Sequence, residues 1–247
     1  MNAMRRVLVV GGSEEYIGAP YLCGISALRS GAGSVIIMAP EKVAWAINTL
    51  SPDLMTRKLK GEYLAPIHLS AIKHQLRTAD ILLIGNGAGA RQGTAALMRS
   101  LMKWPGQKVV DADALKVLKE NKIENAILTP NELEWELLEK GNDIKKLLKK
   151  NIVIIKKGAR SQILSGRKIV KLPRTNRGLE RAGMGDILAG LCAGGLAQGL
   201  SLLEAAKFGA KTGNDIANLL SRKKKGYFFL ASDIAEELNK GFFPKTG

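Results

Sequence analysis

The stretch GMGDILAGL, Gly183–Leu191, places two glycines and an aspartate directly before an apolar helical segment. Glycine-rich backbone at the start of a helix offers free N–H groups to an anion. The carboxylate of Asp186 can accept the proton of a hydroxyl that attacks a group bound there. The stretch indicates a phosphoryl-transfer site, although a GxGD string by itself is more often a turn or packing device. Its surroundings must therefore decide between the two interpretations.

The segments that precede this stretch predict an α/β fold. Short β-branched runs alternate with longer helical patterns, which is typical of a parallel sheet covered by helices. Several runs are apolar throughout, as expected for strands buried on both faces. The predicted strands are Arg6–Val10, Ser34–Met38, Ile81–Ile84, Lys108–Val110, Ala126–Leu128 and Ile152–Ile155, with a hairpin of Gln162–Leu164 and Lys168–Lys171.

Helical patterns separate these strands, and Pro20 falls in a first helical turn, where its missing N–H costs little. The predicted helices are Ala19–Ser30, Glu41–Thr49, Leu69–Thr78, Thr94–Lys103, Ala114–Glu120, Glu132–Lys140, Asp186–Gln198 and Leu202–Ser221. Neither a linker nor an internal repeat divides the chain. We therefore expect one domain over residues 1–247.

Composition and charge narrow the class of protein. The net charge is +16, yet aromatic residues are scarce and do not interleave with the basic ones, so we expect no nucleic-acid partner. A basic surface would instead attract anionic small ligands such as nucleotides. No apolar run reaches the roughly 20 residues that span a bilayer, and the N-terminus lacks a secretory pattern. We expect a soluble, cytoplasmic protein with no membrane association.

The cysteines and histidines do not suggest a metal centre. Cys23 and Cys192 lie in apolar helical segments, which favours buried thiols over a disulfide or a metal site. His68 and His74 have no metal-ligand spacing. We therefore expect no metal held by thiol and imidazole ligands.

Glycines and polar residues follow four of the predicted strands. Ligands of parallel α/β sheets gather at the carboxyl ends of the strands, so four such loops suggest one shared cleft. The loop after the first strand does not read GxGxxG and lacks the acidic partner of a dinucleotide-binding fingerprint. The loops are Gly11–Ser13, Gly85–Gly87, Asp111–Asp113 and Thr129–Asn131.

Two pairs of residues in these loops each allow two interpretations. Asp111 and Asp113 would face the same side of an extended chain, where they could hold Mg²⁺ or a sugar. Alternatively, Asp113 caps the next helix and Asp111 secures a loop. Asn131 and Glu134 share a helix face and could hold water or Mg²⁺ beside phosphates. They could equally form a capping arrangement.

Two further segments suggest contacts to phosphate or nucleotide. Lys157 and Gly158 end a strand, where an ammonium or backbone N–H could meet a phosphate, although a surface lysine at a turn is the commoner meaning. Asn176 and Gly178 lie in a polar stretch just before Gly183. That stretch would form part of a nucleotide loop or a solvated turn.

An ordered set of motifs resembles the NAD(P)H-hydrate dehydratases of the ribokinase-like superfamily. Each motif alone is weak evidence, but their order from about Gly11 to Gly199 is specific. The motifs are GGSEEYIGAP at 11–20, ALRSGAGSV at 27–35, IGNGAG at 84–89, VDADAL at 110–115, LTPNELE at 128–134, KKGARS at 156–161 and NRGLERAGMGDILAGL at 176–191.

The resemblance implies a three-layer α/β/α fold with a central, mostly parallel sheet, and an enzyme that repairs damaged cofactors. Family members dehydrate NADHX and NADPHX to NADH and NADPH at the expense of ADP or ATP, with Mg²⁺. Phosphorylation of the hydrate hydroxyl creates a leaving group, and elimination restores the ring. The family also implies a homo-oligomer, often a tetramer. Family members often carry a fused epimerase domain, for which this chain is too short, so we expect a separate epimerase.

The resemblance also implies roles for residues. Asp186 would be the base, and Gly183 to Gly185 would form the anion hole. The nucleotide would contact Lys157, Gly158, Ala159, Arg160, Ser161, Asn176 and Gly185. The hydrate would lie near Ala19, Gly87, Asn131 and Asp186. The Mg²⁺ ligands expected from spacing, through water, are Asn131 and Glu134.

Some positions depart from the family pattern. Asn131 stands where the family usually has His, and NxxE is similar to the magnesium-linked motif of ribokinase-like sugar and vitamin kinases. Ala182 and Met184 replace Gly and Thr of the usual GGTGD, Arg181 replaces Thr, and Asn86 replaces Pro of the usual GPG loop. The alternatives are a ribokinase-like kinase of a small alcohol or vitamin precursor, and a non-catalytic nucleotide-binding relative.

Overall fold

The computed structural model describes residues 5–238 of the 247-residue chain. Within that range a nine-stranded sheet has the order β3-β2-β1-β4-β5-β6-β7-β8-β9. Pairing is parallel from β3 to β7, while β8 and β9 join antiparallel. The strands are β1 Arg6–Val10, β2 Ser34–Pro40, β3 Met55–Leu59, β4 Ile81–Ile84, β5 Gln107–Val110, β6 Ala126–Leu128, β7 Ile152–Lys156, β8 Gln162–Ser165 and β9 Lys168–Lys171.

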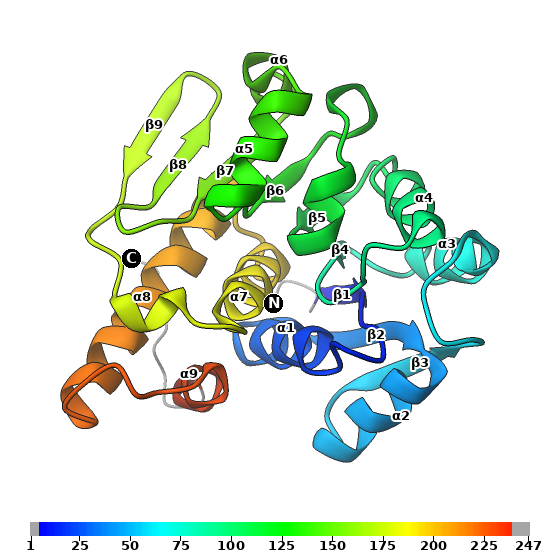
Figure 1. The fold of residues 1–247 in the computed structure, drawn as a ribbon, viewed down its shortest axis with the longest axis horizontal. Helices are drawn as coiled ribbons and strands as arrows, with labels where there is room; N and C mark the ends of the chain where they lie inside the picture. The colour runs from blue at the N-terminus through cyan, green and yellow to red at the C-terminus, as the bar shows by residue number, and fades with distance from the viewer. Residues whose placement is uncertain (1–4, 239–247) are drawn as a thin grey trace.

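Helices cover both faces of this sheet (Figure 1). The first face carries α1 Gly18–Arg29, α2 Glu41–Leu50, α7 Met184–Ala197, α8 Leu202–Lys223 and α9 Ala231–Glu237. The second carries α3 Leu69–Leu76, α4 Gln92–Leu101, α5 Glu132–Gly141 and α6 Ile144–Leu148. The predicted three-layer α/β/α architecture with a mostly parallel sheet is confirmed.

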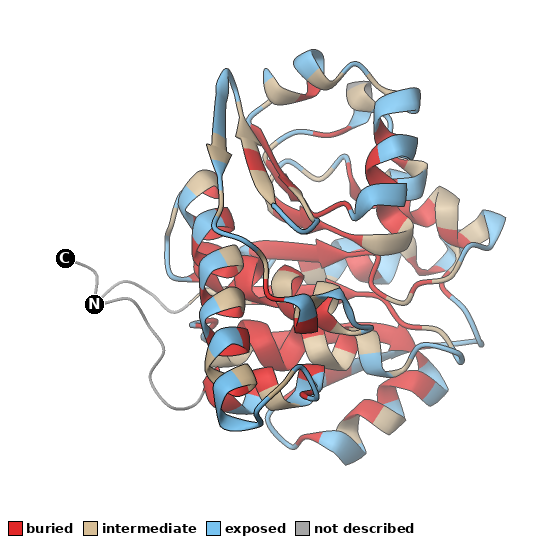
Figure 2. Cartoon of the chain, turned by 60° about the vertical axis from the view of Figure 1, so that its left-hand side comes forward, coloured by how far each residue is buried: buried red, intermediate tan, exposed pale blue. Residues whose placement is uncertain are grey.

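Alternation along each strand divides the apolar side chains between two cores. Val7 and Val9 of β1 face α1 and α7, whereas Leu8 and Val10 face the opposite helices. Burial of both faces explains the continuous apolar runs in the central strands. Figure 2 shows this distribution, with buried strands between helices whose outer sides are exposed.

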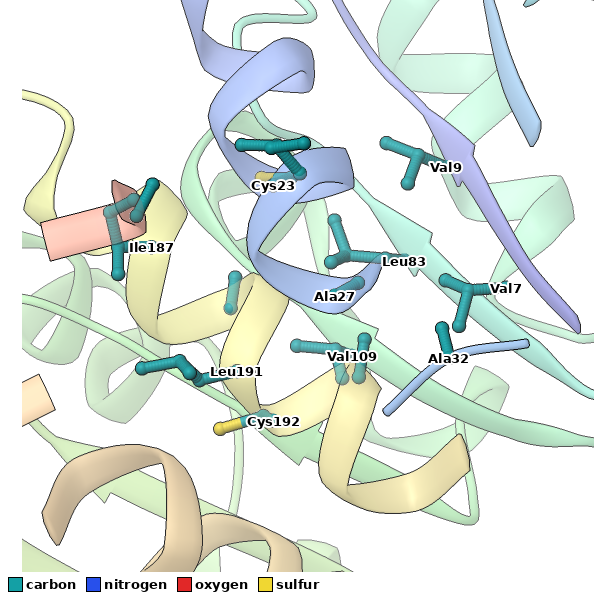
Figure 3. Packing of buried hydrophobic residues seen from close by; sticks show 14 of the residues in the cluster. Val7, Val9, Cys23, Ala27, Ala32, Leu83, Val109, Ile187, Leu191 and Cys192 are labelled. Atoms are coloured by element: carbon teal, nitrogen blue, oxygen red, sulfur yellow. The ribbon is translucent and has the colours of Figure 1, made fainter. Parts of the chain in front are cut away.

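The first core contains both cysteines. Cys23 on α1 and Cys192 on α7 are fully buried and free, as the sequence predicts. Figure 3 shows them among the packed apolar side chains of the two helices, with Ile187 and Leu191 nearby on α7. Close packing of α1 on α7 fixes the N-terminal end of α7 relative to the sheet.

Three elements were missed by the sequence analysis, and one predicted helix is wrong. The missed elements are β3, α6 and α9. The predicted helix Ala114–Glu120 is replaced by two 3-10 turns, Ala112–Val117 and Glu120–Lys122, because Leu118 and Lys119 between them are extended. Short 3-10 turns are common as connectors between elements.

The loops at the carboxyl ends of the strands meet as predicted. Gly12 N–H donates to the Asn86 carbonyl (2.9 Å), which joins the loops after β1 and β4. Asp111 follows β5 and accepts a hydrogen bond from Thr129 Oγ1 (2.7 Å) after β6. These loops, together with the start of α7, form the candidate site.

Candidate active site

The site begins where Gly183 turns the chain into α7. Gly183 has φ +82°, a left-handed conformation that favours glycine. A Cβ there would lie 2.9 Å from both Ala231 Cβ and Leu22 Cδ1. N–H groups in the first turn of a helix have no partner four residues earlier, and the helix dipole makes this end favourable for an anion. The backbone of Gly185 and Asp186 is therefore suited to a phosphoryl group.

Asp186 lies in that first turn and belongs to a buried polar cluster. Its Oδ1 accepts a hydrogen bond from Asn86 Nδ2 (2.7 Å) and contacts Cys23 Sγ (3.9 Å). Burial raises the pKa of Asp186 to about 6, against the lowering effect of the Asn86 hydrogen bond. Burial also raises the pKa of Cys23, so its thiol is a neutral donor. A carboxylate whose pKa is near neutrality is suited to proton transfer.

Asp111 is the second carboxylate of the cluster, and each of its oxygens is hydrogen-bonded. Oδ1 accepts from Thr129 Oγ1 (2.7 Å) and pairs with Lys157 Nζ (3.1 Å), while Oδ2 accepts from Asn86 Nδ2 (2.9 Å). Its side chain is almost fully buried. Buried carboxylates are stable when ion-paired and hydrogen-bonded in this way.

The interpretation of Asp111 and Asp113 as a carboxylate pair is wrong. Asp113 accepts a hydrogen bond from Gly89 N–H (2.8 Å) and pairs with Lys116 Nζ (2.7 Å). Ala112 between them has φ +50°, so the chain is not extended there, and the two carboxylates have different partners. Only Asp111 belongs to the cluster.

Lys157 brings a cation to the start of α7. A Cβ on Gly185 would lie 3.2 Å from Lys157 Nζ, so the ammonium lies beside the glycine backbone. Burial lowers the pKa of Lys157, but the carboxylates of Asp111 and Glu134 outweigh this effect and raise the pKa overall. Lys157 is therefore charged beside the anion position.

Asn131 and Glu134 form a capping box at the start of α5. Asn131 Oδ1 accepts from Glu134 N–H, and Glu134 Oε2 accepts from Asn131 N–H, both at 2.9 Å. This is the capping arrangement that the sequence left open. Burial raises the pKa of Glu134, which is only 8% exposed. Both side chains still line the adjacent cavity.

A cavity of about 930 Å³ opens in front of this cluster. Asp111, Lys157 and Asp186 are among its polar lining residues, and an apolar wall is made by side chains of β7, α7, β9 and the segment between β9 and α7. Cavities of this size with a few convergent polar groups are typical small-molecule sites. The apolar wall consists of Ile155, Val170, Leu172, Leu179, Leu188 and Leu191.

Most predicted nucleotide residues line this cavity, but two do not. Gly158, Ala159 and Ser161 are part of its lining, whereas Arg160 and Asn176 are not. Asn176 instead holds the turn before α7 in place: it accepts from Gly178 N–H and donates to Asn218 Oδ1 and Ser221 Oγ.

The residues predicted to bind the hydrate lie around Asp186, in two groups. Asn131 and Asp186 line the cavity. Ala19 and Gly87 lie together outside it, since a Cβ on Gly87 would be 3.0 Å from Ala19 Cβ. They connect to Asp186 through Asn86, the neighbour of Gly87, and through α1, which carries both Ala19 and Cys23.

Sequence reasoning missed a polar stripe on α8. Lys207, Lys211 and Asn214 all line the cavity. Their spacing of four and three residues would place them on one helix face, so helical periodicity was a signal that could have found them. Thr175, which also lines the cavity and contacts Ser161 Oγ (3.0 Å), carries no such signal.

The fold has known counterparts among solved structures. A ribokinase-like superfamily protein from Enterococcus faecalis aligns with 97% of this chain and 87% of its own at TM-score 0.82 and 21% identity. An ADP/ATP-dependent NAD(P)H-hydrate dehydratase from Bacillus subtilis was co-crystallised with ATP/Mg²⁺. It aligns with 98% of this chain and 94% of its own at TM-score 0.79 and 22% identity. These likenesses define the class of fold: the chain shares the three-layer α/β/α fold of these proteins.

Sequence comparison then gives the family. The family model described as NAD(P)H-hydrate dehydratase matches residues 7–240, and the chain belongs to this family. It is 34% identical over 238 residues to a bifunctional NAD(P)H-hydrate repair enzyme from Methanocaldococcus jannaschii. The aligned region covers 94% of this chain and 47% of that relative. The chain spans about half the length of the curated relatives it matches.

Proposed function

We propose that this chain is a nucleotide-dependent NAD(P)H-hydrate dehydratase, which repairs NADHX and NADPHX to NADH and NADPH with ADP or ATP. The observation that carries the proposal is Asp186, a partly buried carboxylate with a pKa of about 6, in the first turn of α7 beside a large cavity. Family membership supplies the substrate, and the geometry supplies a base and an anion site.

Asp186 performs the proton transfer in this proposal. Its carboxylate takes the proton of the hydrate hydroxyl as that oxygen attacks the terminal phosphorus of the nucleotide. The bond between that phosphorus and its bridging oxygen breaks, so ADP leaves as AMP or ATP leaves as ADP. The phosphate ester then departs as inorganic phosphate while the adjacent ring carbon loses a proton, which forms the C=C bond of the restored ring. Backbone N–H groups from Gly183 to Gly185 and the Lys157 ammonium stabilise the charge on the transferred group.

The nucleotide lies in the cavity in this proposal. Its phosphates approach Gly185 and the loop of Lys157, Gly158, Ala159, Arg160 and Ser161, while the apolar wall accepts the base. Asn176 acts from outside the cavity by holding the turn that leads into α7. The exposed Lys207 and Lys211 add positive charge at the cavity lining.

The hydrate approaches Asp186 from the side of Ala19, Gly87 and Asn131. Small residues at Ala19 and Gly87 allow a ligand to come close to the backbone. Asn131 uses its side-chain oxygen in the capping box, which leaves its amide nitrogen to donate to the substrate. This arrangement brings both the hydrate and the nucleotide to the Asp186 carboxylate.

The residues fit an Mg²⁺ ion held through water. Mg²⁺ usually keeps several waters and binds one or two carboxylates together with substrate phosphates. Residues 5–238 contain no group of three or more His, Cys, Asp or Glu side chains that could hold a metal alone. Asn131 and Glu134 line the cavity beside Lys157, so they would hold the ion through water, where it neutralises phosphate charge. Glu134→Gln should weaken the Mg²⁺ dependence of ADP binding, measured by calorimetry.

The wider organisation is also proposed from the family. We propose one domain, a homo-oligomer such as a tetramer, a cytoplasmic location and a separate epimerase partner, with no nucleic-acid partner. No helix in the described part of the chain is long and apolar enough to cross a membrane.

The proposal is tested by incubating the protein with NADHX, Mg²⁺ and either ADP or ATP. Absorbance of the reduced nicotinamide should recover only when a nucleotide is present. No recovery with either nucleotide would contradict the proposal. A stable phosphorylated alcohol without elimination would indicate a kinase instead, and tight nucleotide binding without turnover would indicate a non-catalytic relative.

A further inference from the structure

Asn86 bridges the buried carboxylate of Asp111 and the partly buried carboxylate of Asp186 with one nitrogen. Its Nδ2 donates to Asp186 Oδ1 at 2.7 Å and to Asp111 Oδ2 at 2.9 Å. The Asn86 side chain is fully buried. A side-chain amide nitrogen carries two hydrogens, so each carboxylate receives one. The amide therefore separates two groups that would otherwise repel each other.

The orientation of this amide is determined by the carboxylates. Asn86 Oδ1 is buried and has no hydrogen-bond partner among the residues the structure describes. Rotating the amide by 180° would direct this oxygen at two carboxylate oxygens, which is unfavourable. Leaving a buried acceptor unpaired also costs free energy. The two hydrogen bonds from Nδ2 to the carboxylates therefore stabilise this orientation more than the unpaired Oδ1 destabilises it.

The backbone at Asn86 is held as firmly as its side chain. Gly12 N–H donates to the Asn86 carbonyl, and a Cβ on Gly11 would lie 2.4 Å from that oxygen. Gly85 has φ +110°, and a Cβ there would meet the Asp111 carbonyl at 2.1 Å. The loop leaves Asn86 little freedom to move away from the carboxylates.

Asn86 contributes a larger share of the hydrogen bonds that hold Asp186 than of those that hold Asp111. Asp111 is also held by Thr129 and Lys157, whereas Asp186 Oδ1 has, among the described residues, only the longer Cys23 contact besides Asn86. No hydrogen bond to Asp186 Oδ2 is found within residues 5–238, and Asp186 lines the cavity. The two oxygens of Asp186 are thus unequal.

We propose that Asn86 is a positioning residue: it anchors Oδ1 of Asp186 to the buried cluster and so leaves Oδ2 to accept the substrate proton. This inference rests on the proposed function, in which Asp186 is the base. A base held by one oxygen presents the other in a fixed direction, which proton transfer requires.

The groups around Asp186 determine how its pKa should change when Asn86 is replaced. Burial raises its pKa, Asn86 lowers it, Asp111 raises it and Lys157 lowers it, while Cys23 also lowers it as a hydrogen-bond donor. Glu134 acts one step away, as a carboxylate facing Lys157. Loss of the Asn86 donor removes a lowering effect and exposes Asp186 to Asp111, so its pKa should rise.

The first test compares Asn86→Ala with the wild type as the pH is varied. We expect kcat to fall roughly tenfold or more and its acidic limb to move up by about one pH unit. KM for the nucleotide should change by less than about twofold, because Asn86 is not part of the cavity lining. Asn48→Ala is the matched control, since Asn48 on α2 makes comparable bonds with Leu54, Thr56 and Lys58 outside the site.

The second test needs no turnover, so it remains informative if the proposed function fails. The melting temperature of each protein and of its Asp186→Asn counterpart is followed with pH, and the difference reports the pKa of Asp186. We expect that pKa to be higher in Asn86→Ala than in the wild type. Asn86→Ser provides the same comparison if the alanine variant does not fold. An unchanged pKa together with an unchanged kcat limb would overturn the inference.

Discussion

The two sides of Asp186 differ in burial and in hydrogen bonding. On one side, Asn86, Asp111 and Cys23 are buried and tied together by hydrogen bonds. On the other, Gly158 and Lys211 line an open cavity and are exposed. We call these the buried wall and the open wall. The difference indicates that the buried wall fixes the base, while the open wall is free to bind and release a nucleotide.

The largest expected effect comes from removing the carboxylate that joins the two walls. Asp186→Asn should lower kcat by about a thousandfold, which matches the contribution of a general base. Nucleotide binding, which depends on the open wall, should change by less than about threefold. Turnover and calorimetric binding measured on one preparation check both expectations. Near-normal turnover in this variant would remove Asp186 from the role of base.

Two glycines offer the sharpest contrast in stability. Gly183→Ala should destabilise the fold by about 2–4 kcal/mol, because φ is +82° and the new methyl group meets Ala231 and Leu22. Gly158→Ala should change stability by less than about 0.5 kcal/mol, since a Cβ there meets nothing within 4 Å. Urea unfolding of the two variants is the measurement. Equal losses would mean that the start of α7 is no more constrained than the loop that holds Gly158.

The pH dependence of stability tests the buried wall directly. The pKa of Asp186 is raised to about 6 in the folded state, so its stabilising contribution is fully present below the unfolded value of about 4 and is lost as pH rises through 6. Asp186→Asn removes this buried charge. The variant should be more stable than the wild type by roughly 1–3 kcal/mol at pH 7 and about equal at pH 4. A variant that is less stable at pH 7 would contradict the assignment.

The smallest effect is expected on the open wall. Lys211→Ala should weaken nucleotide binding only about two- to fivefold, because an exposed lysine contributes little in high dielectric and is screened by salt. The loss should shrink as salt is added. Titrations of ADP at low and high ionic strength check this, and a loss that does not depend on salt would assign Lys211 a direct, desolvated contact.

Much of the fold follows from the sequence, since the patterns that define it are local. The central apolar strands and the amphipathic helices are periodic, and their order predicts loops that meet at one edge of the sheet. Strand β3 was missed because Met55–Leu59 is partly polar and exposed at the edge, with no apolar run. The short helices α6 and α9 have too few turns for a clear period.

The site is less predictable, because it depends on backbone geometry and on contacts between distant segments. Asp186 could be proposed from its motif, but the different partners of Asp111 and Asp113 depend on the positive φ of Ala112. The bridge from Asn86 to Asp186 joins residues 100 positions apart in the sequence, and no local pattern encodes it. The structural role of Asn176 has the same origin, since its partners lie on α8.

The most direct test of the whole account is the ratio of phosphate released to NADH formed in a single turnover. Wild-type protein with NADHX, Mg²⁺ and either ADP or ATP should yield one phosphate for each NADH, and Asp186→Asn should yield almost none of either. This result would mean that phosphorylation and elimination are coupled at Asp186. NADH formed without phosphate, or phosphate released without NADH, would contradict the account.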